Sequence, residues 1–291
     1  MLNLVLSILF SSFIFVIFKL FHKFGVQTLF AIIVNYFVAA LVGLLFYSGT
    51  ISVSNIPSQS WFYSTLILGF LFIVVFNLMA KTAQTVGVAA ASVATKMSFI
   101  LPVLVGVLLF NEALSILKVL GMLLAIAAVY LTSKKQTTAK NAIKKEIHVL
   151  LLPVFVFLGS GLIDISLKYL QEKIVPSNEL SLFSATVFLS AGIIGVVFIG
   201  VTAIKQPLKI NIKNILGGIA LGVPNFFSIY FLLKALEIGN LNSASIFTLN
   251  NVAIVLCSTF LGILLFKEKL IRENWQGIAL AVTSIILVAL F

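Results

Sequence analysis

One lysine lies inside a long apolar stretch of the sequence, where an ammonium group is costly. Lys96 follows the small-residue run 89–95 and comes eight residues after Val88, where the stretch begins. Eight helical residues span about 12 Å, so Lys96 would lie near the middle of a hydrocarbon layer about 30 Å thick. Its burial there costs about 2.5 kcal/mol or more unless it faces a polar cavity or a partner. We therefore predict that Lys96 attracts an anionic or carboxylate-bearing ligand, with snorkelling or a structural ion pair as the alternatives.

Asp164 is the second charge that falls within an apolar stretch. Lys168 follows one helical turn later, so the two side chains can pair on one helix face. The alternative is a functional role in ligand binding, as the partner of Lys96 or as a site that takes up and releases a proton. Counting residues along the helices places Asp164 nearer the outer face than Lys96, which leaves direct contact between them open.

Polar uncharged residues within the apolar stretches form a third group of candidates. Such side chains often bond neighbouring membrane helices, and they can also line a substrate cavity. We predict substrate binding for this group, together with Lys96 and Asp164, and keep the structural role as the alternative. The residues are Asn35, Asn77, Asn225, Tyr230, Asn250 and Asn251.

Several other residues mark the ends or bends of the expected helices. Glu112 and Glu268 each close an apolar stretch and precede the next one, which is typical of a residue that caps or anchors the following helix. Pro102 and Pro224 lie inside apolar stretches, where proline kinks a helix and frees backbone carbonyls. Lys19 lies close to a helix end, and we expect its ammonium to snorkel to the interface.

The sequence carries no motif that predicts catalysis. It contains no HExxH, no GxxxxGKS/T and no nucleophile-elbow pattern. Cys257 is the only cysteine, so neither an intrachain disulfide nor a cysteine metal cluster can form. We therefore expect no enzyme activity, no cofactor and no metal site, and any transport would be passive or driven by a gradient.

All these residues are carried by ten long apolar blocks. Hydrophobic residues make up 61% of the 291 residues and charged residues only 9%, which excludes an ordinary soluble domain. The blocks are continuously apolar and not alternating, which favours membrane-spanning helices over a β-barrel. The sequence thus predicts an all-α integral membrane protein with ten transmembrane helices. The blocks are residues 2–20, 28–47, 61–80, 88–110, 116–131, 149–170, 180–202, 213–236, 242–266 and 274–291.

An internal repeat divides the sequence into two halves. Glu112 aligns with Glu268, and Gly121 with Gly277, at one common offset of 156 residues. Each half holds five helices, an odd number, so the second half must enter the membrane from the opposite side. That arrangement gives inverted repeats, which are common among secondary transporters. The predicted parts are a first repeat over 1–132, a basic linker over 133–148 and a second repeat over 149–291.

Basic residues are unevenly distributed between the loops. A formal net charge of +11 would suggest nucleic-acid binding in a soluble protein. Here the basic residues lie mainly between apolar blocks, where cytoplasmic loops collect them. Fourteen Lys and Arg fall on one side of the membrane, five of them in the linker, and four fall on the other. We predict a cytoplasmic linker, both termini outside, and no nucleic-acid partner.

The closing part of each repeat has the same order of features: small residues, an apolar run, then a glutamate. It reads AAASVATKMSFILPVLVGVLLFNEAL in the first copy and SASIFTLNNVAIVLCSTFLGILLFKEKL in the second. This order resembles the drug/metabolite transporter superfamily, in its EamA-like ten-helix branch. The second copy departs from the first, with Leu249 opposite Lys96 and Val255 opposite Pro102. Many members of that family have both termini in the cytoplasm, opposite to the orientation that the charges favour.

The resemblance implies a substrate cavity lined by the first four helices of each repeat. The fifth and tenth helices would then be peripheral, in contact with lipid, and could support a homodimer in place of a monomer. The implied function is a secondary small-molecule transporter of the bacterial inner membrane. Export of an amino acid or related metabolite by alternating access is the leading hypothesis. The alternative is a non-transporting membrane sensor or a membrane-embedded enzyme, which a soluble regulatory or catalytic domain would favour.

Overall fold

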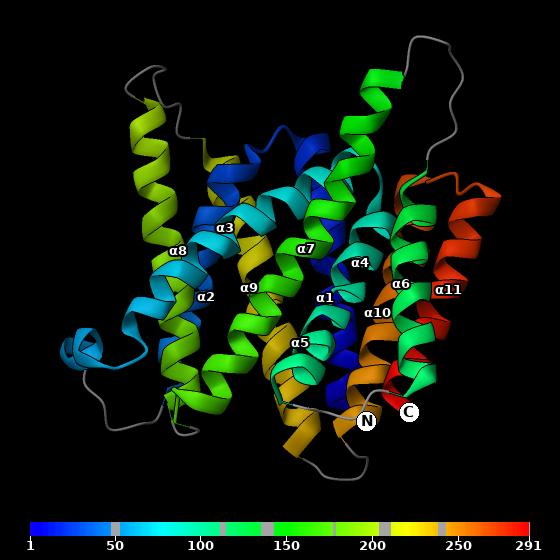
Figure 1. The fold of residues 1–291 in the computed structure, drawn as a ribbon. Coiled ribbons are helices and arrows are strands. Elements are labelled where there is room, and N and C mark those ends of the chain that lie inside the picture. Colours follow the sequence, from blue (N-terminus) through cyan, green and yellow to red (C-terminus); the bar gives the residue numbers. More distant parts are fainter. Residues whose placement is uncertain are drawn as a thin grey trace.

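The computed structural model is a bundle of α-helices (Figure 1). It describes residues 1–47, 53–110, 115–134, 143–176, 179–203, 211–237 and 243–290. Within these ranges the secondary structure is helical, including one short 3-10 helix, η1 (Val53–Ser58), and no strand is present. Helices are expected here because an α-helix satisfies its backbone hydrogen bonds within one segment, which hydrocarbon requires.

Each predicted block corresponds to one helix, except the fourth, which is divided in two. The first half holds α1 (Leu2–Phe24), α2 (Thr28–Leu45), α3 (Phe62–Thr85), α4 (Val88–Met97), α5 (Ile100–Phe110) and α6 (Ile116–Ser133). The second half holds α7 (Ile143–Lys173), α8 (Leu180–Ala203), α9 (Ile212–Glu237), α10 (Ser243–Phe266) and α11 (Arg272–Leu290). The helix α7 begins before the predicted block, within the basic linker.

The protein is a multi-pass membrane protein. Within the described residues, nine helical stretches are long and apolar enough to cross a membrane, with α4 and α5 counted together as one. The tenth crossing is α11, which begins with the charged residues Arg272 and Glu273 and packs along α6. Consecutive crossings alternate in direction, so α1 and α7 run in opposite directions and both termini lie at one end (Figure 1). The two five-helix halves are therefore inverted repeats, as the odd number of helices predicts.

Contacts between the halves follow the same inverted symmetry. The helix α1 packs on α9, and its counterpart α7 packs on α3. Likewise α1 packs on α10, while α7 packs on α4 and α5. The core is thus built mostly from contacts between repeats, so neither half buries its apolar surface alone.

The glycines that revealed the repeat both lie where α6 and α11 cross. A Cβ on Gly121 would come within 2.6 Å of Val288 Cγ2, and a Cβ on Gly277 within 2.8 Å of the Thr132 backbone nitrogen. Small residues allow this close backbone approach, which is a common basis of helix association in membranes. The Ser284 hydroxyl also donates to the Gly121 carbonyl at 2.7 Å.

The fourth crossing is broken near the predicted depth of Lys96. Helix α4 ends at Met97 and α5 begins at Ile100. Pro102 lies in the first turn of α5, where its missing N–H leaves no helical hydrogen bond unmade. The predicted disturbance at Pro102 is therefore present, as a helix break just before it. At Pro224, in contrast, α9 continues as one helix, so no comparable break occurs there.

Candidate functional site

Lys96 lies in the last turn of α4, beside the helix break. Its side chain is only partly buried, whereas its neighbours on the helix are nearly all buried. Among the described residues, none is hydrogen-bonded or ion-paired to its ammonium group. The carbonyls at the end of α4 carry partial negative charge, which favours a cation at this place. The nearby carboxylate of Asp164 interacts with this ammonium electrostatically, without forming a direct ion pair with it.

Asp164 lies on α7 and reaches the same helix break from the second repeat. Its Oδ2 accepts a hydrogen bond from the Ser98 hydroxyl at 2.9 Å. The same hydroxyl lies 2.6 Å from the Thr95 carbonyl oxygen, so its single proton is shared between two acceptors. Ser98 comes two residues after Lys96 and is almost fully buried. One cation and one anion, from different repeats, therefore lie near the helix break.

Two of the predicted asparagines contact each other between the repeats. Asn225 Nδ2 on α9 donates to Asn35 Oδ1 on α2 at 3.1 Å, and both side chains are buried. Asn35 Nδ2 also lies 3.4 Å from the Ile32 carbonyl of its own helix. These contacts agree with a structural role for the two asparagines, and binding of a substrate by this pair stays a prediction.

The remaining predicted residues lie in three separate places. Asn250 on α10 is buried and accepts a hydrogen bond at 3.2 Å from Ser7 on α1. Asn77 donates to the Ile73 carbonyl of its own helix at 2.7 Å. Tyr230 packs in an aromatic group, with its ring 5.4 Å from Phe46. Asn251 is partly buried. Among the described residues, none of these four is hydrogen-bonded to Lys96 or Asp164.

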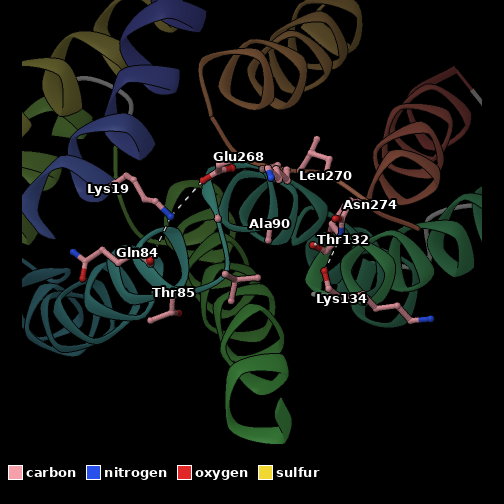
Figure 2. A pocket seen from close by; sticks show the side chains of 13 residues that line it. Lys19, Gln84, Thr85, Ala90, Thr132, Lys134, Glu268, Leu270 and Asn274 are labelled. Carbon is pink, nitrogen blue, oxygen red and sulfur yellow. Dashed lines mark hydrogen bonds and ion pairs between the residues drawn. The ribbon is translucent and has the colours of Figure 1, made fainter. Parts of the chain in front are cut away.

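A polar pocket lies at the opposite end of α4, where that helix begins (Figure 2). Its volume is about 260 Å³, and its lining includes Lys19, Gln84, Glu268 and Asn274. Asn274 Nδ2 donates to three backbone carbonyls at the end of α6, those of Leu131, Thr132 and Lys134. We call this end of the molecule, which contains the ends of α1, α3, α6 and α10, the Lys19 end.

Glu268 caps α4, which corrects the expectation that it would cap the helix that follows it. Its two carboxylate oxygens accept from the Val88 backbone N–H at 3.0 and 3.2 Å. The same carboxylate forms an ion pair of 3.4 Å with Lys19, whose ammonium also donates to the Gln84 carbonyl at 3.3 Å. Lys19 is therefore ion-paired, and snorkelling does not describe it. Glu112, the counterpart of Glu268, lies outside the described residues.

Ser98 and the contact between Glu268 and Val88 were not predicted from the sequence. Ser98 carried a weak signal, because a serine so close to Lys96 in an apolar block is a natural polar neighbour. Glu268 and Val88 belong to different repeats, and no pattern within one repeat places them together. Gly87 has a φ of 147°, and a Cβ there would come within 3.1 Å of Glu268 Oε2. This glycine gives the carboxylate room, but its role becomes visible only in three dimensions.

Comparisons with known proteins agree with this architecture. A family model described as the EamA-like transporter family matches residues 1–134 and 147–290. A relative from Haemophilus influenzae, described as an uncharacterized protein, is 32% identical over 220 residues, which cover 76% of this chain and 72% of the relative. A solved structure, described as a crystal structure of a protein, aligns over 98% of this chain and 94% of its own, with a TM-score of 0.59 and 16% identity. At that identity the structural likeness supports the fold alone.

Proposed function

Because the chain belongs to the EamA-like transporter family, we propose that it is a secondary transporter that exports an amino acid or a related carboxylate-bearing metabolite. The family match and the nine long apolar helical stretches among the described residues make it a multi-pass membrane transporter in general terms. The proposal adds the substrate class, the direction and the mechanism, which is alternating access of one site between two inverted repeats. It also places the protein in a bacterial inner membrane, a location that the Haemophilus influenzae relative supports.

The single observation that carries the substrate class is the environment of Lys96. An ammonium within the hydrocarbon layer is costly unless a partner or a polar path compensates it. Lys96 has no hydrogen-bonded or ion-paired partner among the described residues, and its side chain is only partly buried. A carboxylate that bound there would form a charge-assisted hydrogen bond, which is stronger than a neutral one. An ammonium in this environment therefore suits a substrate carboxylate as its partner.

Asp164 contributes negative charge at the same helix break. One of its oxygens is engaged by Ser98 at 2.9 Å. Its presence lowers the cost of holding an ammonium in the membrane, and the second oxygen is a candidate acceptor for a cationic group of the substrate. Because Lys96 and Asp164 come from different repeats, the affinity for a substrate that contacts both would depend on the relative position of the two halves. Alternating access requires a site whose affinity changes with that position.

The test is transport by purified protein in liposomes, with a panel of amino acids and with matched amines that lack the carboxylate. Lys96→Ala should reduce binding or transport of the carboxylate substrate by about 10- to 100-fold, since hydrogen bonds to charged groups contribute about 1.5–3 kcal/mol. Lys96→Arg should retain part of the activity, because the charge remains while its shape changes.

Lys23→Ala is the matched control, because Lys23 is an exposed lysine in the last turn of α1, outside the membrane core. It should transport like the unmodified protein. Normal transport by Lys96→Ala, with equal amounts of folded protein in the membrane, would overturn the carboxylate assignment. The family membership would stand, because it rests on the match of both repeats.

A further inference from the structure

Glu268 joins three segments that are distant in the sequence. It follows α10 of the second repeat, caps the first N–H group of α4, that of Val88, and pairs with Lys19 near the end of α1. The ion pair is largely shielded, with 12% of the Glu268 side chain and 23% of the Lys19 side chain exposed. A carboxylate at a helix N-terminus also interacts favourably with the helix dipole. Both interactions depend on α1 and α10 staying close to the start of α4.

Gln84 extends this group of contacts to α2 and α3. Its side-chain nitrogen donates to the Phe18 carbonyl at 2.9 Å and lies 3.0 Å from the Thr28 hydroxyl. The Gln84 backbone carbonyl accepts a hydrogen bond from the Lys19 ammonium at 3.3 Å. The ends of α1 and α3, the starts of α2 and α4, and the segment after α10 are therefore tied together at the Lys19 end.

The corresponding helices of the second repeat are not packed in this way. In the first repeat α1 contacts both α3 and α4. By the inverted symmetry, α7 should contact α9 and α10 at the opposite end of the molecule. Within the described residues α7 packs instead on α3, α4, α5 and α6, without a comparable contact to α9 or α10. Among the described residues, the helices of the first repeat are thus tied together more extensively at the Lys19 end than their counterparts in the second repeat are at the other end.

We propose that the ion pair between Lys19 and Glu268 is a latch that holds the Lys19 end closed and that breaks when the transporter opens there. This inference rests on the proposed alternating access. Opening the Lys19 end between the two repeats requires the end of α1 to separate from the segment after α10. The contact of 3.4 Å between Lys19 and Glu268 spans that boundary, so it cannot persist in the opened state.

Helix α4 connects this ion pair directly to Lys96. Helix α4 is ten residues long, Glu268 holds its first residue, and Lys96 lies in its last turn. A helix of that length is about 15 Å long and behaves as a short rod. A change at the Glu268 end therefore tilts the same element that carries the ammonium. The structure assigns Glu268 the role of a positioning residue, which acts on the substrate site through α4 and does not touch the substrate.

The experiment measures how fast a cysteine in the pocket reacts. A single cysteine replaces Ala90, a pocket residue that is 2% exposed, in a Cys257→Ser background. The protein is studied in nanodiscs, where a small methanethiosulfonate reagent reaches both ends, so the result does not depend on membrane orientation. Lys19→Met and Glu268→Gln should each raise the reaction rate by about 5- to 30-fold, which corresponds to the loss of a shielded ion pair of about 1–2 kcal/mol.

The two substitutions separate the latch from the helix cap. Glu268→Gln keeps an oxygen that can accept from Val88, and Lys19→Met leaves the cap intact. Glu179→Gln is the matched control, since Glu179 accepts a hydrogen bond from Trp61 Nε1 at 2.7 Å on the starts of α8 and α3, away from the Lys19 end. It should leave the Ala90→Cys rate unchanged.

A second reporter distinguishes opening from unfolding. Ala191→Cys lies in the core with 0% exposure and should stay unreactive in every variant. Unchanged Ala90→Cys rates in both latch variants would overturn the proposal. A parallel rise at Ala90→Cys and Ala191→Cys in both variants would overturn it as well, because the pair would then support only the fold. The assay needs no substrate, so failure of the carboxylate assignment would leave this result intact.

Discussion

Single polar side chains in this protein bridge helices from different repeats. The Asn35–Asn225 contact joins α2 to α9, and the Ser7–Asn250 contact joins α1 to α10. In hydrocarbon an amide without a partner is costly, so each residue is stabilised by the other. Such bridges hold the two halves in register, and they form inside the membrane, where water cannot compete for them.

We expect the Asn35–Asn225 pair to show measurable coupling. Either single substitution, Asn35→Ala or Asn225→Ala, leaves the other amide buried without this bond and should destabilise the protein. A double-mutant cycle should give a coupling free energy of about 0.5–2 kcal/mol, in the range known for membrane helices. The measurement is the unfolding free energy in mixed detergent micelles. Strictly additive single effects would show that the 3.1 Å contact contributes nothing.

At this scale, the sequence predicts which residues stand out but not what they contact. Lys96 can be recognised because charge and depth are both readable from the sequence. That Asp164 on α7 bonds to Ser98, two residues after Lys96 and in the break between α4 and α5, can be seen only in the structure. The Lys19–Glu268 ion pair is even harder to predict from the sequence, because both residues lie near helix ends, where solvent-exposed lysines and glutamates are common.

At the scale of helices, close packing between α6 and α11 depends on two glycines with different surroundings. A Cβ on Gly121 would meet the end of the Val288 side chain at 2.6 Å, which can move. A Cβ on Gly277 would meet the backbone nitrogen of Thr132 at 2.8 Å, which cannot move without shifting α6. Equivalent glycines in the two repeats should therefore tolerate substitution differently.

We predict that Gly277→Ala destabilises the protein by about 1–3 kcal/mol, the usual cost of overpacking. Gly121→Ala should cost less, and Val288→Ala should restore part of its loss by making room. The measurement is the thermal midpoint in detergent. Gly200→Ala serves as the control, because no heavy atom lies within 4 Å of its added Cβ. Equal losses of stability in Gly277→Ala, Gly121→Ala and Gly200→Ala would contradict this account of how α6 and α11 cross.

The existence of the helices was predictable, whereas their breaks were not fully so. Continuous apolar blocks indicate membrane crossings directly, because hydrocarbon thickness sets their length. Proline gave an ambiguous signal: near Pro102 the helix is interrupted, while α9 continues through Pro224. A proline in the first turn accompanies a new helix start, but a proline in mid-helix can be accommodated by neighbouring helices. Local sequence does not distinguish these two environments.

On the scale of the whole molecule, inversion was predictable from simple counting. Five helices in each half, with Glu and Gly at one common offset, require that the second half be inverted. The alternating directions of the crossings confirm it (Figure 1). The unequal packing of α7 and α1 was not predictable, because it depends on contacts between helices that are far apart in the sequence.

The orientation of the molecule in the membrane remains a prediction from its charges. Thr137, in the basic linker and outside the described residues, should face the cytoplasm, and Ser58 on η1 should face outward. In a Cys257→Ser background, an impermeant thiol reagent added to intact cells should label Ser58→Cys and spare Thr137→Cys. The reverse labelling pattern would invert the predicted orientation and leave the fold unaffected.

The two repeats carry different residues at one equivalent position, Lys96 in the first and Leu249 in the second, and Leu249 is 46% exposed. If the repeats were identical, exchanging their conformations would give two carrier states of equal energy. Under the proposed alternating access, a charge in one repeat only would give the empty carrier a preferred resting face, and half-saturation would differ between the two faces of the membrane. Detailed balance still fixes the final gradient, so this asymmetry changes rates alone. If the return of the empty carrier limits the cycle, substrate on the far side would accelerate exchange without raising net efflux.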